Sequence, residues 1–230
     1  MGGYSQIDCE IRLLEEALKN KEIEYFHLLT GQDLPLVNIK EILDFFKENK
    51  EKNFIHFDRK VKSIERYERI KYYRLFQELA GRNKNIYSIL QNKLLLPLQK
   101  LLKIDRSKRY KGIEFKSGSA YFSITREFAE YIMSNEKNIK EWFSFAICGD
   151  EMFIQTLAYN SKFKETLYNT RFNDNCLANQ RYIDWNSGSP YTWRISDFQD
   201  LKESNCLFAR KFDEEIDSLI IEKVIESIQK

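Results

Sequence analysis

A short apolar and aromatic run, Tyr25–Leu29, lies between two segments with helical patterns. In the first, residues 7–18, apolar side chains recur at spacings of four, three and four, which predicts an amphipathic helix with Ser5 as the expected N-cap. In the second, Asn38 is followed three residues later by Glu41, a pattern typical of a helix N-terminus. A buried strand between two helices, followed by a loop with glycine and proline, predicts an α/β fold.

The rest of the chain continues this alternation, without a repeat, a linker or a low-complexity segment. Over residues 63–80 the pattern fits a helix and a strand equally well. The other expected strands are Phe54–Phe57, Gly112–Ile124 and Arg181–Trp185, and the other expected helices are 85–104 (broken near Pro97), 125–133, 138–145, 149–159 and a last helix capped by Asp213. We therefore expect a single domain, residues 1–230, with a mixed sheet flanked by helices.

Two adjacent carboxylates, Asp150 and Glu151, follow Gly149 and precede an apolar run that begins at Phe153. Acidic residues in the first turn of a helix are favoured by the helix dipole, so either residue can be a simple cap. A carboxylate at such a turn can also act as a general base. The local pattern leaves both interpretations open.

The charges are balanced, with 37 basic and 35 acidic residues and a net charge of +2, which argues against nucleic-acid binding. The basic and aromatic segment Arg66–Arg74 could stack on bases, but aromatic faces and arginines also suit sugar rings. The eight glycines match neither the dinucleotide-binding nor the P-loop spacing. Ser117-Gly118-Ser119 lacks the second glycine of a nucleophile elbow.

The metal-ligand and membrane signals are weak. Cys9, Cys148, Cys176 and Cys206 share no CxxC spacing, the two histidines are separate, and no Asp-x-Asp triplet is present. We therefore expect no metal site and a reducing compartment. No apolar run approaches the roughly 18 residues that span a bilayer. The expected location is the cytoplasm, either free or peripheral at the inner face of the membrane.

Five segments in order resemble the core-2/I-branching β-1,6-N-acetylglucosaminyltransferases of the bacterial type. The first, Tyr25–Leu36, is similar to the family's His-x-x-Ser-Gly-x-Asp-x-Pro-Leu signature. The others are Gly118–Thr125, Glu141-Trp142 followed by Gly149–Phe153, Arg181–Trp185, and Phe208–Asp213. The ordered resemblance covers nearly the whole chain.

The resemblance implies a GT-A-like fold and an inverting transfer from a UDP-sugar without a metal ion. The second acid of the family's Asp-Glu pair is the base, which corresponds to Glu151. Its basic groups near the diphosphate correspond to Lys211 and Arg181. This agrees with the chemistry, because an inverting transfer needs a base for the acceptor hydroxyl and positive charge for the leaving diphosphate.

Further substrate contacts are expected at loops and strand ends. Gln32 and Asp33 follow the Tyr25–Leu29 strand, where sugar hydroxyls could bind. The other expected substrate-binding residues are Gly118, Ser119, Asp150 and Trp185, with Asp150 also capping the helix. A UDP-sugar donor and a saccharide acceptor are the expected partners, with no nucleic acid and no cofactor.

The chain also departs from the family pattern. A β-α-β segment that binds uridine precedes these blocks in the family, so we expect the first strands of the nucleotide fold to be missing. Gly149 replaces a proline of the family, which loosens the turn. Exposed sheet edges left by missing strands would favour association with other chains.

The resulting hypothesis is a metal-independent transferase that moves a sugar to a saccharide hydroxyl in surface-polysaccharide synthesis. N-acetylglucosamine is the expected donor sugar, and xylose is the alternative within the family. A different class of function, a non-catalytic remnant or saccharide-binding module, stays open because of the missing uridine-binding segment.

Overall fold

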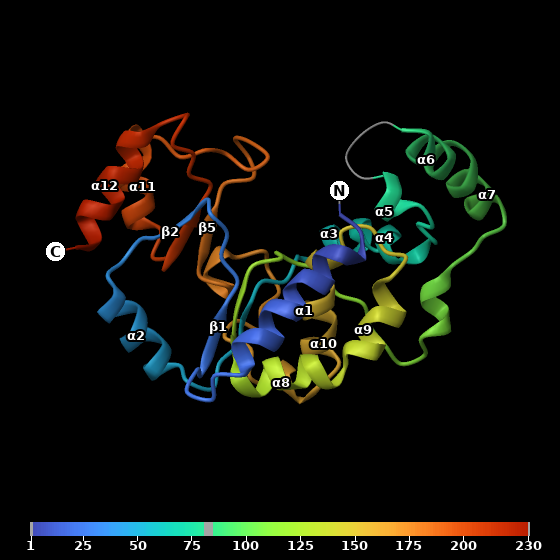
Figure 1. The fold of residues 1–230 in the computed structure, drawn as a ribbon, viewed down its shortest axis with the longest axis horizontal. Helices are drawn as coiled ribbons and strands as arrows, with labels where there is room; N and C mark the ends of the chain where they lie inside the picture. The colour runs from blue at the N-terminus through green and yellow to red at the C-terminus, as the bar shows by residue number, and fades with distance from the viewer. Residues whose placement is uncertain (1, 81–84, 230) are drawn as a thin grey trace.

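The computed structural model describes residues 2–80 and 85–229 and is a mixed α/β structure, as the sequence predicts (Figure 1). The α-helices are α1 (Tyr4–Leu18), α2 (Ile39–Glu48), α3 (Lys60–Arg66), α4 (Glu68–Lys71), α5 (Gln77–Ala80), α6 (Ile86–Ile89), α7 (Leu96–Leu101), α8 (Arg126–Ser134), α9 (Glu136–Phe143), α10 (Phe153–Tyr159), α11 (Phe198–Glu203) and α12 (Ser218–Ile228). A π-helical turn, Leu90–Leu95, joins α6 to α7. In the described residues no helix is both long enough and apolar enough to cross a membrane.

Six short strands within the described residues form two sheets of three strands each. The strands are β1 (Tyr25–His27), β2 (Asp33–Pro35), β3 (Phe54–Ile55), β4 (Phe122–Thr125), β5 (Arg181–Ile183) and β6 (Phe208–Arg210). The first sheet has the order β1-β4-β3 and is antiparallel. The second has the order β2-β6-β5, with β2 antiparallel and β5 parallel to β6.

Each sheet contributes to its own hydrophobic core. Beside the first sheet, α1, α8, α9 and α10 lie together (Figure 1) and bury side chains such as Ile11, Ile132 and Phe153 with Ile124 of β4. Beside the second sheet, α11 and α12 bury a smaller cluster that includes Ile220. The apolar faces read from the sequence are therefore the faces that the fold buries.

Arg181 of β5 connects the two sheets. Its guanidinium donates hydrogen bonds to the backbone oxygen of Phe122 (3.0 Å) and to Oγ of Ser123 (3.0 Å), both in β4. It also lies over the ring of Phe208 in β6, with 4.3 Å between the guanidinium carbon and the ring centroid. This buried arginine fixes β5 next to β4, on the side where the candidate site lies.

The expected strand Gly112–Ile124 is wrong over most of its length, because only its last residues, with Thr125, form β4. The preceding residues bond to loops and helices instead of to a neighbouring strand. The Gly118 N–H donates to the backbone oxygen of Glu151 (2.9 Å), and the Lys116 N–H donates to Oγ1 of Thr156 (3.2 Å). Hydrogen bonds to residues distant in the sequence therefore replace the strand pairing that was expected.

Two expected helix starts are also wrong. The last helix is capped by Asp217, whose side chain accepts from the Ile220 N–H (3.2 Å), while Asp213 caps the preceding turn. Ser5 lies inside α1, which begins at Tyr4. The Ser5 N–H and hydroxyl donate to Glu78 (2.9 and 2.8 Å), a partner that local sequence cannot indicate.

Residues 63–80 and 85–104, whose secondary structure the sequence predicted only roughly, form short helices. Residues 60–80 contain α3, α4 and α5. The expected long helix over 85–104 consists of α6, the π-helical turn and α7, and Pro97 is the second residue of α7, which directly follows that turn.

Candidate active site

A cleft of about 450 Å³ lies between the ends of β3 and β4 in the first sheet and β5 in the second. Its lining includes Glu151, two segments that follow β3, and the loop before β4. Most of the sequence-predicted site residues lie in this lining, namely Glu151, Asp150, Gly118, Ser119, Arg181 and Trp185. The fold thus brings together residues from three separate blocks of the sequence.

Glu151 stands at the end of a short 3₁₀ turn, Gly149–Glu151, and its carboxylate faces two arginines. Its Oε2 lies 2.9 Å from Nη1 of Arg66 and also accepts a hydrogen bond from Arg69. About a quarter of its side chain is exposed (27%), so the carboxylate is accessible from the cleft. Paired guanidinium groups hold a carboxylate in a defined orientation, which suits a group that must meet a substrate hydroxyl.

The loop before β4 packs tightly behind this carboxylate. A Cβ atom on Gly118 would lie only 1.8 Å from the backbone oxygen of His56, so no other residue fits without a shift of the backbone. The carbonyl oxygen of Gly118 accepts from Nη1 of Arg66 (2.9 Å). Gln155, fully buried in α10, donates to the backbone oxygens of His56 (3.1 Å) and Ser119 (2.7 Å). These contacts fix the wall of the cleft.

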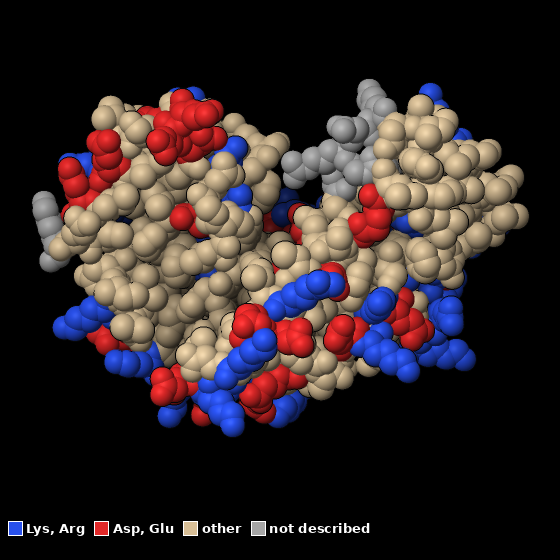
Figure 2. All heavy atoms as spheres, in the orientation of Figure 1, with Lys and Arg blue, Asp and Glu red and all other residues tan. Residues whose placement is uncertain are grey.

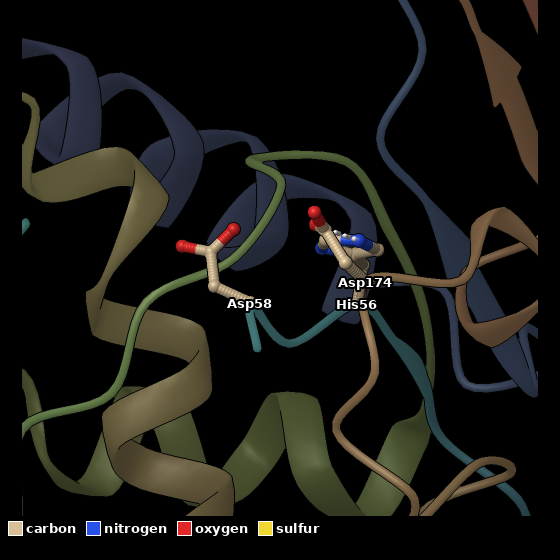
Figure 3. Close-up of side chains that lie close together, drawn as sticks. All are labelled: His56, Asp58 and Asp174. Atoms are coloured by element: carbon tan, nitrogen blue, oxygen red, sulfur yellow. Dashed lines mark ion pairs between the residues drawn. The ribbon is translucent and has the colours of Figure 1, made fainter. Parts of the chain in front are cut away.

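His56, Asp58 and Asp174 form a second polar group in the cleft (Figure 3). The Ser119 N–H donates to Nδ1 of His56 (3.1 Å), which places the imidazole proton on Nε2, facing Oδ1 of Asp174 (3.1 Å). The hydrogen bond from His56, aided by Lys62, lowers the pKa of Asp174 well below its usual range. Asp174 is therefore a charged residue at neutral pH.

The ligand atoms of His56, Asp58 and Asp174 all lie within 4.8 Å of one another, which is compact enough for a metal ion. Basic side chains of the protein, however, already form ion pairs with the two carboxylates. Lys62 lies 3.2 Å from Asp58 and 3.1 Å from Asp174, and Arg66 lies 3.1 Å from Asp58. Since Nδ1 of His56 accepts a backbone N–H and Nε2 faces Asp174, the group fits an ion-pair network better than a metal site.

Asp150 also lines the cleft, in a poorly solvated position. Burial, together with the charge of Glu151, raises the pKa of Asp150 to about 6. Burial and the nearby Asp150 also raise the pKa of Glu10, on α1, well above its usual range. Among the described residues, Oδ1 of Asp150 and Oε2 of Glu10 have no hydrogen-bond partner. The capping role expected for Asp150 is not observed, because no side chain caps this turn and α10 begins only at Phe153.

The raised pKa of Asp150 makes a pH-dependent contribution to stability. Between the ordinary pKa of 3.8 and about 6 the folded protein binds more protons than the unfolded chain, so this residue destabilises the fold as the pH rises. We expect Asp150→Asn to change the free energy of unfolding little at pH 4 and to increase it by about 1–3 kcal/mol at pH 7. Urea unfolding at both pH values measures the difference. The exposed control Asp44→Asn should show no such trend, and a gain equal at both pH values would contradict the assignment.

Arg181 is the more deeply buried of the two predicted diphosphate-binding residues. It lines the cleft but is only 2% exposed, and burial lowers its pKa to about 10. Besides the contacts with β4, its guanidinium donates to the backbone oxygen of Asn179 (2.6 Å). Most of its N–H groups therefore donate hydrogen bonds within the protein, although its positive charge lies at the cleft.

Three predicted residues, Gln32, Asp33 and Lys211, do not line the cleft. Asp33 begins β2, and its carboxylate faces inward: it accepts from the Thr30 N–H and lies 3.6 Å from Nε of Arg210. The backbone oxygen of Gln32 accepts from the Phe212 N–H (3.0 Å). Lys211 follows β6, and its Nζ lies 3.8 Å from Asp213.

The sequence reasoning did not assign the arginines that hold Glu151. In the sequence, Arg66 and Arg69 lie in the basic and aromatic segment Arg66–Arg74, whose composition suits bases or sugar rings and does not distinguish one arginine from another. Their spacing of three residues places both on one helical face, which is the local signal that was available. Lys62 one turn earlier and His56 at the end of β3 were also missed, because an isolated lysine or histidine is not distinctive in a sequence.

Two cysteines that are distant in the sequence become neighbours beside the cleft. The thiol of Cys206 donates a hydrogen bond to Sγ of Cys176, at 3.7 Å, and this bond lowers the pKa of Cys176 below its usual value. Both thiols are free.

A larger hollow of about 860 Å³ lies beside α3, lined partly by Ile64, Tyr67 and Tyr110. Charged side chains also line this hollow, but none of the sequence-predicted site residues does. The smaller cleft, which contains Glu151 and its partner Arg66, is therefore the better candidate for the active site.

Comparison with known proteins agrees with the resemblance read from the sequence. Residues 1–204 match the family described as Core-2/I-Branching enzyme. Xylosyltransferase 2 of Rattus norvegicus is 23% identical over 237 residues, covering 96% of this chain and 25% of the relative. Xylosyltransferase sqv-6 of Caenorhabditis briggsae is 29% identical over 141 residues, covering 54% of this chain and 18% of the relative.

The chain therefore spans about a quarter or less of the length of these relatives. The family match, in contrast, includes α1, both sheets except the last strand, and the whole Glu151 turn. The mixed sheets flanked by helices are consistent with a GT-A-like fold. The chain belongs to the Core-2/I-branching enzyme family of glycosyltransferases.

Proposed function

We propose that this protein is an inverting glycosyltransferase that moves a sugar from a UDP-sugar to a saccharide hydroxyl without a metal ion. The observation that carries the proposal is the position of Glu151, held by Arg66 and Arg69 at the rim of a cleft of sugar size. In the proposed reaction, Glu151 takes the proton of the acceptor hydroxyl as that oxygen attacks the anomeric carbon. The bond to the diphosphate breaks, and UDP leaves.

Basic side chains replace a metal ion in this proposal. Arg59, Lys62 and Arg181 line the cleft, so positive charge is available where the leaving diphosphate gains negative charge. Lys211 follows Arg210, which is paired in register with the cleft residue Ile183. Since β5 and β6 are parallel, their carboxyl ends meet at one edge, and Lys211 lies at that edge.

We expect Lys211→Ala to weaken UDP binding about tenfold, because a charge-assisted contact to phosphate is lost. Isothermal calorimetry with UDP measures the change, with the exposed Lys137→Ala as the matched control. EDTA should leave UDP binding by the unaltered protein unchanged. Loss of UDP binding in EDTA would contradict the metal-free reaction, and normal binding by Lys211→Ala would remove Lys211 from the site.

The donor sugar that we propose is N-acetylglucosamine, with surface polysaccharide as the acceptor. Xylose is the second candidate, favoured by the names of the similar proteins, which are xylosyltransferases. Turnover measured in parallel with UDP-N-acetylglucosamine and UDP-xylose distinguishes the two donors. Binding of a saccharide with no binding of either nucleotide sugar would instead favour the non-catalytic saccharide-binding module.

A further inference from the structure

The segment from α5 to the end of α7 exposes an unusual number of large apolar side chains. Figure 2 shows the surface over α6 and α7 as largely tan, with blue at its margin. The side chains concerned are between 42% and 77% exposed: Leu75, Leu79, Ile86, Tyr87, Ile89, Leu94, Leu98, Leu101 and Leu102. We refer to these nine residues as the apolar face. Contiguous exposed apolar surface of this kind marks an interaction site.

The segment is turned so that polar residues face inward and leucines face outward. Gln91 (1% exposed) accepts from the Phe76 N–H (3.1 Å) and donates to the Tyr73 backbone oxygen (3.3 Å). Gln99 (8% exposed) accepts from the Tyr73 N–H (2.8 Å) and donates to the same oxygen (3.0 Å). These four hydrogen bonds fix the orientation of the π-helical turn and α7. The apolar face is therefore held outward by the fold, and its exposure is not the result of loose packing.

After Glu78, the charged residues of this segment are all basic. Between Glu78 and Asp105 the chain has no acidic residue, although 35 acidic residues in 230 would place about four in these 26 positions. Within the same stretch Lys93, Lys100 and Lys103 are exposed. Apolar side chains combined with lysines and no acids are the composition of a helix that lies at a membrane interface.

We propose that the apolar face docks on the surface of an anionic lipid bilayer. The leucines would enter the boundary between head groups and acyl chains, while Lys93 and Lys103 meet the anionic head groups. A second copy of this chain fits less well, because an isologous contact would bring the same acid-free, basic segments together. A protein partner would have to supply acidic residues around an apolar surface, whereas an anionic bilayer supplies both features.

The test is co-sedimentation of the 230-residue protein with vesicles of phosphatidylcholine containing about 30% phosphatidylglycerol. We expect binding, and a loss of roughly tenfold in partitioning for each of Leu98→Gln and Leu101→Gln, because each removes a large apolar side chain that the bilayer would bury. Leu43→Gln in α2 and Leu219→Gln in α12 are matched controls, with 52% and 58% exposure in the unaltered protein. Both controls should bind like the unaltered protein.

A charge variant tests the second half of the proposal. Lys93→Glu combined with Lys103→Glu should reduce binding to the anionic vesicles, and salt at ~0.5 M should reduce binding by the unaltered protein. Circular dichroism verifies that each variant is folded. The proposal is overturned if the folded protein does not bind anionic vesicles, or if Leu98→Gln and Leu101→Gln bind normally. It is also overturned if sedimentation shows a stable dimer that these two variants dissociate, since a second copy then covers the apolar face.

Discussion

Replacement of Glu151 by glutamine is expected to reduce sugar transfer by about 10²–10⁴-fold, the usual contribution of a general base. Glutamine keeps the size of the side chain but cannot accept the proton of the acceptor hydroxyl. Product formation from the UDP-sugar and a competent acceptor measures the loss. UDP binding, followed by calorimetry, should change much less, because Glu151 is proposed to act on the acceptor.

The same substitution leaves Arg66 and Arg69 without their carboxylate, so stability must be followed alongside activity. Thermal unfolding of Glu151→Gln separates a catalytic loss from a folding defect. The exposed Glu165→Gln is a matched control and should retain both activity and stability. Full transfer activity in Glu151→Gln would refute the assignment of the base.

Gly118→Ala is expected to be the most damaging small substitution in the protein. The new Cβ would lie 1.8 Å from the backbone oxygen of His56 and 2.8 Å from Nε2 of Gln155. A contact with backbone cannot be relieved by a side-chain rotation, so the loop must move. We expect a loss of at least about 1–3 kcal/mol in the free energy of unfolding, the usual cost of overpacking.

The consequences should extend to the candidate base. The Gly118 N–H is bonded to the backbone oxygen of Glu151, and the Gly118 carbonyl oxygen to Arg66. Any shift of this loop therefore moves both partners of the ion pair. Gly31→Ala is the matched control, because a Cβ there meets nothing within 4 Å. If denaturant unfolding finds both variants equally stable, the close packing at Gly118 does not exist in solution.

Helix caps were predictable because cap and partner are three residues apart. The side chain of Asn38 accepts from the Glu41 N–H (2.9 Å), as expected, and that of Thr125, the first residue of an expected helix, accepts from the Phe128 N–H (3.3 Å). The apolar faces of the helices followed from their periodicity for the same reason. Local chemistry was sufficient wherever one turn of the chain contained all the interacting groups.

Predictions from local sequence were wrong where the interacting groups lie far apart in the sequence. Asp213 and Asp217 both suit a helix start, and only the docking of α12 on the second sheet selects Asp217. Residues 112–121 have a strand-like composition, yet their backbone groups bond to the Glu151 turn and to α10. Over 85–104 the leucines predicted a helix but not its orientation, which two buried glutamines decide.

For the candidate site, too, some features follow from local sequence and others only from the packing of distant segments. The sequence by itself determined a short acidic turn with Glu151 before an apolar helix. Only the tertiary structure packed Gly118 against the backbone of His56. Only the tertiary structure brought Arg66 and Arg69, more than 80 residues earlier, onto that carboxylate, and turned Asp33 inward. Ion pairs between distant segments depend on how two sheets and their helices pack, and no local pattern of residues encodes that geometry.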